Sequence, residues 1–397
     1  MQQTWRWFGP QDPVTLRNVV QAGASGVVSS LHQIPTGDLW PLQAILDHKR
    51  LIEDAGLEWT VVESVPVHND IKTRSGDFEH YIDNYQATLR HLGQVGIKVV
   101  CYNFMPVVDW TRTNLSYELP NASQGLRFEM TDFAAYDVYL LKRKDAAQDY
   151  DPKLLEKAKA RLDAMSEAQK KELENNIIAG LPGGHDGHSR DSIRQAIAEF
   201  IDLGTQGLRD NLFTFLKAVI PVAEQSGVRM CIHPDDPPFS LFGLPRVVST
   251  AQDARELLAA APSPCNGLTL CAGSFGARAD NDLVGMVKEF GPNIHFVHLR
   301  NIKREDDGSF FESEHLDGDN DIVGLVQALL AEEETRRGQG RDDMIPMRPD
   351  HGHTLGDEIG KAGVNPGYSF AGRLKGLAEL RGVIHTVERL RNDALQG

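Results

Sequence analysis

The chain is poor in long apolar runs, in basic charge and in cysteine. No segment approaches the roughly eighteen apolar residues of a membrane span, and the first ten residues contain no apolar stretch of signal-peptide length. Lysine and arginine number 41 against 56 acidic residues, a net charge of -15. Because nucleic-acid binding needs a basic face, we expect neither a nucleic-acid partner nor a membrane partner.

Cysteine is also rare in this chain. The chain has four cysteines, with neither CxxC spacing nor the density of a disulfide framework. We therefore expect a soluble cytoplasmic protein whose thiols stay reduced. Each cysteine is by default a small buried packing residue, and an exception would be a metal ligand or a nucleophile.

What the chain does contain is a repeated alternation of short apolar runs and helical patterns. Such alternation is typical of βα units and a parallel sheet. We predict strands over Thr4–Phe8, Gly26–Leu31, Trp59–Glu63, Lys98–Asn103, Arg229–His233, Gly267–Ala272, Ile294–Arg300 and Met344–Arg348. We predict helices over Val14–Ala22, Leu42–Ala55, Glu79–Val95, Asn211–Gln225, Ala251–Ala260, Asn281–Phe290, Ile322–Arg337 and Ala371–Leu390. Glycines that suit left-handed helix ends follow several of them, at Gly23, Gly56, Gly96, Gly227 and Gly291.

This pattern predicts an α/β fold of the (β/α)8 TIM barrel class, with an open doubly wound sheet as the alternative. The barrel is favoured because chemically capable side chains end many different strands, whereas an open sheet gathers them at one switch point. We expect a single domain over residues 1–397. An insertion over about 105–207, helical at Asp151–Asn175 and Asp191–Asp202, would follow the fourth strand on the catalytic face.

Four potential metal ligands fall at the ends of four successive predicted strands. They are His233, Cys271, His298 and Asp350. In a barrel the C-terminal strand ends converge on one mouth, so we expect these four side chains to meet around one divalent ion. Mixed nitrogen, sulfur and oxygen ligation suits Mn²⁺, Fe²⁺ or Zn²⁺ better than Mg²⁺ or Ca²⁺, which prefer oxygen ligands.

Other candidates are weaker. Cys101 ends a strand, where packing is the expected role. Asp235 and Asp236 are candidate acceptors for a ligating histidine. His185 and His188 lie in the insertion, where we expect a loop and no second metal site.

Several separate motifs are spread over nearly the whole chain. They are Trp-Arg-Trp-Phe-Gly-Pro at Trp5, Val-Glu-Ser-Val-Pro-Val-His ending at His68, Cys-Tyr-Asn-Phe-Met-Pro at Cys101, His-Pro-Asp-Asp-Pro-Pro at His233, Arg-Pro-Asp-His-Gly-His at Arg348 and Asn-Pro-Gly-Tyr-Ser at Asn365. Together they resemble the mannonate dehydratase family of hexuronate (glucuronate) breakdown, the metal-dependent kind related to xylose-isomerase-like barrels.

The resemblance implies a lyase that removes water from D-mannonate to give 2-dehydro-3-deoxy-D-gluconate. It implies that Mn²⁺ or Fe²⁺ is held by the four ligands above and that His351 and Tyr368 act in catalysis. By residue type, His351 and Tyr368 are an acid/base pair beside the ion. We expect Tyr368 to take the proton from C2 and His351 to protonate the leaving hydroxyl, although the two roles are exchangeable. Arg300, projecting from the same face as His298, would hold the substrate carboxylate.

Two other functions fit the residues. One is a metal-dependent sugar isomerase or epimerase on the same barrel, which would form no keto-deoxy acid. The other is a sugar-acid-binding protein without catalysis, in which His351 and Tyr368 would be dispensable. A homo-oligomer is the expected assembly.

Overall fold

Eight strands of the described chain close into a parallel barrel. The computed structural model describes residues 1–178, 190–341 and 343–396, so His185 and His188 lie outside the described residues. Around the barrel the strand order is β1, β12, β9, β8, β7, β4, β3 and β2. Because β1 pairs with both β2 and β12, the sheet has no open edge. The predicted TIM barrel is therefore confirmed, and the doubly wound alternative is excluded. The strands are β1 (Gln2–Arg6), β2 (Gly26–Ser29), β3 (Glu58–Glu63), β4 (Val99–Tyr102), β7 (Arg229–Ile232), β8 (Asn266–Cys271), β9 (Ile294–His298) and β12 (Pro346–Arg348).

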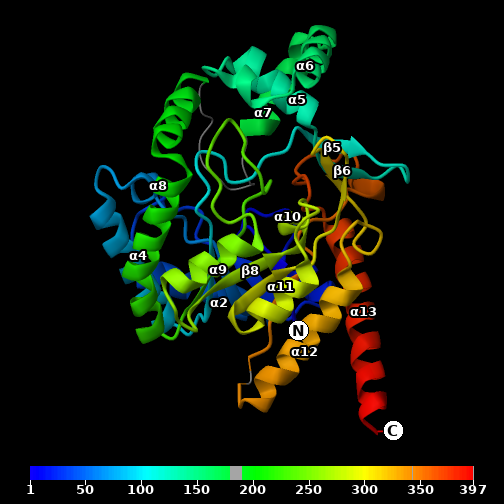
Figure 1. Cartoon of the computed structure of the whole chain (residues 1–397). Coiled ribbons are helices and arrows are strands. Elements are labelled where there is room, and N and C mark those ends of the chain that lie inside the picture. The colour runs from blue at the N-terminus through cyan, green and yellow to red at the C-terminus, as the bar shows by residue number, and fades with distance from the viewer. Residues whose placement is uncertain (179–189, 342, 397) are drawn as a thin grey trace.

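Helices surround this barrel (Figure 1). They bury one face each against the strands and leave the other face to solvent, as α2 does with Ile45 and Ile52 inward and Leu51 exposed. The helices of the barrel body are α1 (Leu16–Gln21), α2 (Leu42–Glu53), α3 (Asn69–Thr73), α4 (Phe78–Gln94), α8 (Arg190–Gln225), α9 (Ala251–Ala260), α10 (Ala272–Phe275), α11 (Leu283–Phe290), α12 (Ile322–Gly338) and α13 (Phe370–Gln396). Within the described residues, no helix is long and apolar enough to cross a membrane.

Local chemistry fixes several helix ends. Thr15 begins α1 and Thr250 begins α9, each with a reciprocal pair of hydrogen bonds to the third helical residue. Four of the predicted helix-ending glycines adopt the left-handed backbone that their position requires, at Gly23, Gly56, Gly96 and Gly227. Gly291 does not: it stays right-handed because the chain continues from α11 directly into the short turn η3 (Gly291–Asn293).

A lobe built from two distant segments extends from one end of the barrel. Residues after β4 form the antiparallel strands β5 (Asn114–Glu118) and β6 (Gln124–Phe128), and residues after β9 form β10 (Ile302–Arg304) and β11 (Phe310–Glu312). These four strands form one sheet in the order β10, β11, β6, β5. Both segments leave the C-terminal ends of barrel strands, so the lobe lies over that end. The sequence did not predict this sheet.

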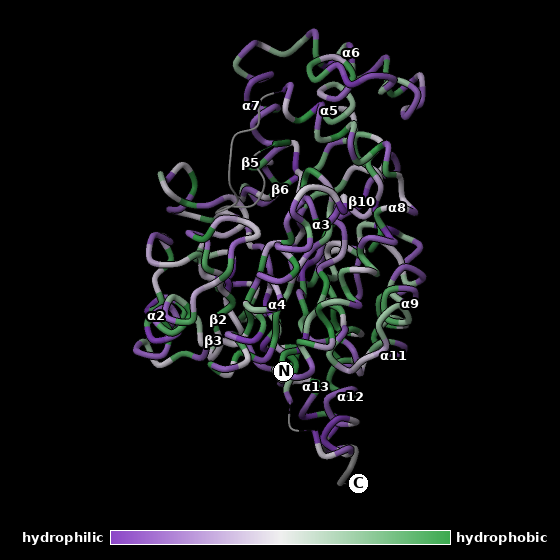
Figure 2. Tube along the Cα trace, turned by 90° about the vertical axis from the view of Figure 1, so that its left-hand side faces the viewer, coloured by the Kyte–Doolittle hydropathy of each residue, from purple (hydrophilic) through white to green (hydrophobic). Residues whose placement is uncertain are grey.

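Helices cover the outer side of the lobe. They are α5 (Met130–Ala135), α6 (Pro152–Ala164) and α7 (Glu167–Ile178), joined by the short turns η1 (Tyr136–Leu141) and η2 (Ala146–Asp149); η4 (Gly356–Glu358) precedes α13. Figure 1 shows α5, α6 and α7 standing above the barrel, with α8 rising toward them. In Figure 2 hydrophobic positions gather in the barrel body, whereas hydrophilic positions are frequent along α6.

Candidate active site

Four strand ends bring the predicted metal ligands together. His233 follows β7 directly, Cys271 and His298 close β8 and β9, and Asp350 lies just beyond β12. Ligand atoms of His233, Cys271 and His298 all lie within 4.8 Å of one another. An oxygen of Asp350 lies 3.9 Å from Cys271 Sγ and 3.8 Å from His298 Nδ1. The four side chains therefore surround one small volume.

The two histidines are oriented as metal-binding histidines usually are. Nδ1 of His233 lies 2.7 Å from the carbonyl oxygen of Pro234, which can only accept, so this nitrogen carries the hydrogen and Nε2 keeps its lone pair. Nε2 of His298 lies 3.4 Å from Glu63, which leaves Nδ1 toward Asp350. A metal-bound imidazole typically directs its other nitrogen at a carbonyl or carboxylate in this way.

His298 also provides a test of whether a metal ion fits. Its side chain is fully buried, and among the described residues neither ring nitrogen has a hydrogen-bond partner of good geometry. A buried polar atom left in this state costs about 1–3 kcal/mol. A cation beside Nδ1 would satisfy that atom, and the thiol, imidazole and carboxylate donors around it suit a first-row transition ion. The residues present therefore fit the expected metal.

Asp350 is held as a charged carboxylate in an unusual backbone position. Its φ is +67°, a conformation that few residues other than glycine adopt. The side chain pairs with the guanidinium of Arg348, and Nη1 of Arg300 lies 3.3 Å from its second oxygen. Burial alone would raise the pKa of Asp350, but the guanidinium groups of Arg348 and Arg300 oppose it and help to hold that pKa well below the usual range.

Glu63, at the end of β3, connects this carboxylate to the other side of the barrel. It lies 2.9 Å from Nη2 of Arg348 and 3.6 Å from Nη1 of Arg6. Burial opposes ionisation, but Arg348 and His298 keep the pKa of Glu63 well below its ordinary value. The mouth of the barrel thus holds alternating buried charges.

A second buried network lies on the lobe side. Arg112, just before β5, makes a two-pronged ion pair with Asp236, at 2.9 and 3.2 Å, and Asp236 also lies 2.7 Å from Nη1 of Arg300. Burial opposes ionisation of Asp236, but Arg112 and Arg300 lower its pKa far below the usual range. Asp235 instead accepts from the backbone of Val248. The expectation that Asp235 or Asp236 orients a ligating histidine is therefore wrong, because their carboxylates accept hydrogen bonds from arginine side chains and from a backbone amide instead.

The two predicted catalytic residues lie together beside the ligand cluster. The rings of His351 and Tyr368 meet edge to face with centroids 5.2 Å apart, and both side chains are 4% exposed. Nδ1 of His351 lies 3.0 Å from an oxygen of Glu312, and Nε2 lies 3.8 Å from Asp350. Burial raises the pKa of Tyr368 and the Asp350 carboxylate adds to this, while Arg348 opposes it.

A pocket opens beside these groups. The predicted residues that line it are His233, Asp350, His351, Tyr368 and Arg300. Cys101 also lines it, although the thiol lies in the barrel interior and its burial raises its pKa. Asn103, Met105, Asp109 and Trp110, which follow β4, also line it. A small polar molecule entering here would meet charged groups at the ligand end.

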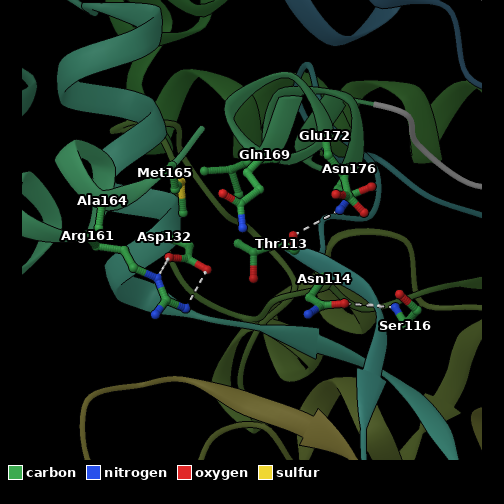
Figure 3. A pocket seen from close by; sticks show the side chains of 11 residues that line it. Thr113, Asn114, Ser116, Asp132, Arg161, Ala164, Met165, Gln169, Glu172 and Asn176 are labelled. Carbon is green, nitrogen blue, oxygen red and sulfur yellow. Dashed lines mark hydrogen bonds and ion pairs between the residues drawn. The ribbon is translucent and has the colours of Figure 1, made fainter. Parts of the chain in front are cut away.

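Another pocket lies in the lobe, between β5 and the helices α5 to α7 (Figure 3). Its polar groups bind one another: Arg161 pairs with Asp132, and the Asn176 amide donates to the Thr113 carbonyl. None of the predicted site residues lines it. The predicted site residues therefore belong to the barrel mouth and not to this lobe pocket.

The sequence reasoning assigned no role to Glu63, Arg348, Arg112 or Glu312. Glu63 ends a barrel strand, which is the same signal that identified the ligands, and Arg348 belongs to the motif around Asp350. Arg112 and Glu312 lie in the lobe and carry no such signal.

Known proteins resemble this chain in sequence over nearly its full length. The family model described as D-mannonate dehydratase matches residues 1–394.

The chain belongs to the D-mannonate dehydratase family.

Individual mannonate dehydratases are also similar to this chain in sequence or in structure. The chain is 67% identical over 392 residues to the mannonate dehydratase of Saccharophagus degradans, covering 98% of this chain and 99% of the relative. It is 57% identical over 389 residues to mannonate dehydratase 2 of Agrobacterium fabrum, covering 98% of each. The crystal structure of mannonate dehydratase from Streptococcus suis serotype 2 superposes with a TM-score of 0.78 at 32% identity, covering 99% of this chain and 95% of that one.

Proposed function

We propose that this chain is a mannonate dehydratase, a hydro-lyase that converts D-mannonate to 2-dehydro-3-deoxy-D-gluconate, and that it uses Mn²⁺ or Fe²⁺ bound by His233, Cys271, His298 and Asp350. The full-length match to the D-mannonate dehydratase family carries the activity. This match does not support either alternative function, the sugar isomerase or epimerase and the non-catalytic sugar-acid-binding protein.

The metal proposal rests on the ligand cluster. Three of the donors, His233, Cys271 and His298, have ligand atoms within 4.8 Å of one another. The fourth, Asp350, lies beside the thiol and beside a ring nitrogen of His298 that has no hydrogen-bond partner among the described residues. When bound, the divalent ion supplies Lewis acidity beside the substrate carboxylate, where negative charge develops as the C2 proton leaves. The thiolate and carboxylate ligands together would nearly neutralise the ion's charge before substrate binds.

The reaction requires a base at C2 and an acid at O3. The base removes the C2 proton, the C3–O bond breaks with protonation of the leaving hydroxyl, and the resulting enol becomes the 2-keto product. Hydrogen-bond geometry supports His351 as the base: its Nδ1 donates to Glu312, so Nε2 is the nitrogen that is left with a lone pair.

Tyr368 then serves as the acid. Burial raises its pKa, which keeps the phenol protonated and ready to donate. This division is the reverse of the one expected from residue type alone. Both groups line the same pocket, as one substrate spanning C2 and O3 requires.

Arg300 is the proposed ligand of the substrate carboxylate. It lines the pocket, and two of its guanidinium nitrogens are engaged, Nη1 by Asp236 and Nε by Glu312 at 3.3 Å. Nη2 has no hydrogen-bond partner among the described residues, so it is the donor that a substrate carboxylate oxygen would accept from.

The activity is tested by incubating Mn²⁺-loaded protein without oxygen with a panel of aldonic acids and measuring the 2-keto-3-deoxy acid. We expect product from D-mannonate. His351→Asn and Tyr368→Phe should keep the metal and lose about 10²- to 10⁴-fold in kcat, the usual contribution of a positioned acid or base. A protein that binds D-mannonate without turnover would refute the proposal.

An analogue separates the two roles. In 3-deoxy-3-fluoro-D-mannonate, fluoride leaves with much less need of a proton. Tyr368→Phe should recover most of its lost rate with this analogue, whereas His351→Asn should not, because the C2 proton must still be removed. Recovery by His351→Asn instead would restore the assignment expected from residue type.

Two broader proposals concern the protein as a whole. A cytoplasmic location is supported by cysteines that form no disulfide among the described residues. The homo-oligomer stays a prediction, which the mass of the protein in solution tests.

A further inference from the structure

The lobe sheet reaches into the active site through one carboxylate. Glu312, the last residue of β11, is 3% exposed, and its Oε1 accepts a hydrogen bond from Nδ1 of His351 at 3.0 Å. We infer that Glu312 is a positioning residue for the dehydration, which fixes the tautomer and the orientation of His351 so that Nε2 can take the C2 proton. This inference rests on the proposed function.

Glu312 is itself held rigidly. Nη2 of Arg112 lies 3.2 Å from Oε1, and Nε of Arg300 lies 3.3 Å from Oε2. Arg112 is fully buried and packs against the rings of Trp110 and Phe310, each 4.8 Å from the guanidinium carbon. Two fixed cations thus keep the carboxylate charged and in place.

The charge of the Glu312 carboxylate determines which ring nitrogen of His351 carries the hydrogen. Burial opposes ionisation of Glu312, but Arg300 and His351 lower its pKa to about 2. An ionised carboxylate has no hydrogen to donate, so the hydrogen in the bond belongs to Nδ1 of His351. The negative charge also stabilises the imidazolium that forms once Nε2 has accepted a proton, as in other carboxylate–histidine pairs.

The loop that carries His351 is clamped by the same sheet. Nε2 of His353 lies 3.0 Å from the backbone oxygen of Glu312, and Thr354 exchanges two backbone hydrogen bonds with Gln124 of β6, at 2.8 and 3.1 Å. Side chain and backbone of the lobe therefore act on one short loop. This gives part of the segment between β4 and β7 a role in positioning the catalytic base.

The test is Glu312→Gln, compared with the wild type on D-mannonate. We expect unchanged metal content, KM within a few-fold, and kcat lower by about 10- to 100-fold, the range for residues that orient a site through another residue. The primary kinetic isotope effect on kcat with C2-deuterated substrate should rise, because proton removal becomes slower. A purely structural role would not change the isotope effect.

Glu305→Gln is the matched control. Glu305 lies in the turn between β10 and β11 and pairs with Arg127, so this change should leave kcat and the isotope effect as in the wild type. Adding Glu312→Gln to His351→Asn should cause no further loss in kcat, because the contribution of Glu312 to proton removal acts through His351, whereas its ion pair with Arg300 would affect KM. If Glu312→Gln does not fold, Glu312→Asp keeps the charge for both arginines while withdrawing it from His351, and should show the same fall in kcat.

Three results would overturn the inference: wild-type kcat in Glu312→Gln or Glu312→Asp, loss of the metal from Glu312→Gln, or a further loss in kcat in the double variant. Absence of wild-type turnover on D-mannonate would instead overturn the proposed function, so the two failures are distinguishable.

Discussion

Replacing Cys271 by serine tests the least common of the four proposed ligands. Sγ of Cys271 is fully buried, 3.9 Å from Asp350 and 3.2 Å from the hydroxyl of Ser274. Serine has a nearly identical shape, but its hydroxyl stays neutral at pH 7 and is a harder donor. The change therefore removes one negative charge and one soft ligand while the packing stays almost the same.

The size of the effect follows from known metal sites. Losing a residue that only orients a ligand costs about 10- to 100-fold in metal affinity, so losing the ligand should cost more than about 100-fold. With excess metal, a 100-fold weaker affinity removes about 2.7 kcal/mol of metal-dependent stabilisation. We therefore expect Mn²⁺ to raise the thermal midpoint of Cys271→Ser much less than that of the wild type.

Metal content after dialysis and thermal unfolding with and without Mn²⁺ measure this effect. Cys265→Ser is the control, since Cys265 is half-buried just before β8 and outside the ligand cluster. Both variants should unfold alike when the metal is chelated. A Cys271→Ser protein that binds Mn²⁺ as tightly as Cys265→Ser would remove the thiolate from the site.

Two further predictions concern packing and charge. In Gly273→Ala the new Cβ would clash with Nε of Arg300, so we expect a loss of about 1–3 kcal/mol in unfolding free energy and a raised KM. In Gly338→Ala the new Cβ meets nothing within 4 Å, so this variant should be as stable as the wild type, and equal stability of the two variants would refute the close contact. Burial opposes ionisation of Asp343, but Arg341 and Arg229 lower its pKa to about 2, below the value of about 3.9 in the unfolded chain. The stabilisation from the Asp343 carboxylate is therefore complete above about pH 3.9 and is lost as the pH falls toward 2. Denaturant unfolding should show Asp343→Asn less stable by a constant amount between about pH 5 and 8 and by less below about pH 4, and a gap that widened on acidification would contradict this sign.

The barrel was predictable because its signals are local. Apolar runs that end in a polar or chargeable residue mark each strand, and the predicted Arg229–His233 and Ile294–Arg300 contain the observed β7 and β9. The four strand-end residues followed from the same pattern, since parallel strands of a barrel place their ends at one mouth.

The lobe was not predictable because the contacts that form it join residues far apart in the sequence. Strand β5 is a short, partly exposed polar segment. Strand β6 is mostly buried, but only Leu126 and Phe128 in it are large apolar residues, and it is buried by pairing with β11 far along the chain. Glu312 meets His351 across 39 residues and Arg112 meets Glu312 across 200. Such pairs depend on tertiary structure and leave no spacing in the sequence.

The pKa of Tyr368 likewise depends on burial that residue type does not reveal. The sequence suggested a base assisted by a nearby cation. The structure surrounds the phenol with Phe8 and His351 and places the Asp350 carboxylate nearby, which favours the protonated form.

X-ray absorption at the manganese edge of the Mn²⁺-loaded protein tests the central claim most directly. The account predicts one bound ion with a sulfur neighbour and nitrogen neighbours from imidazole, and a spectrum in which the sulfur signal disappears in Cys271→Ser. A shell made of oxygen atoms alone would contradict a site formed by His233, Cys271, His298 and Asp350.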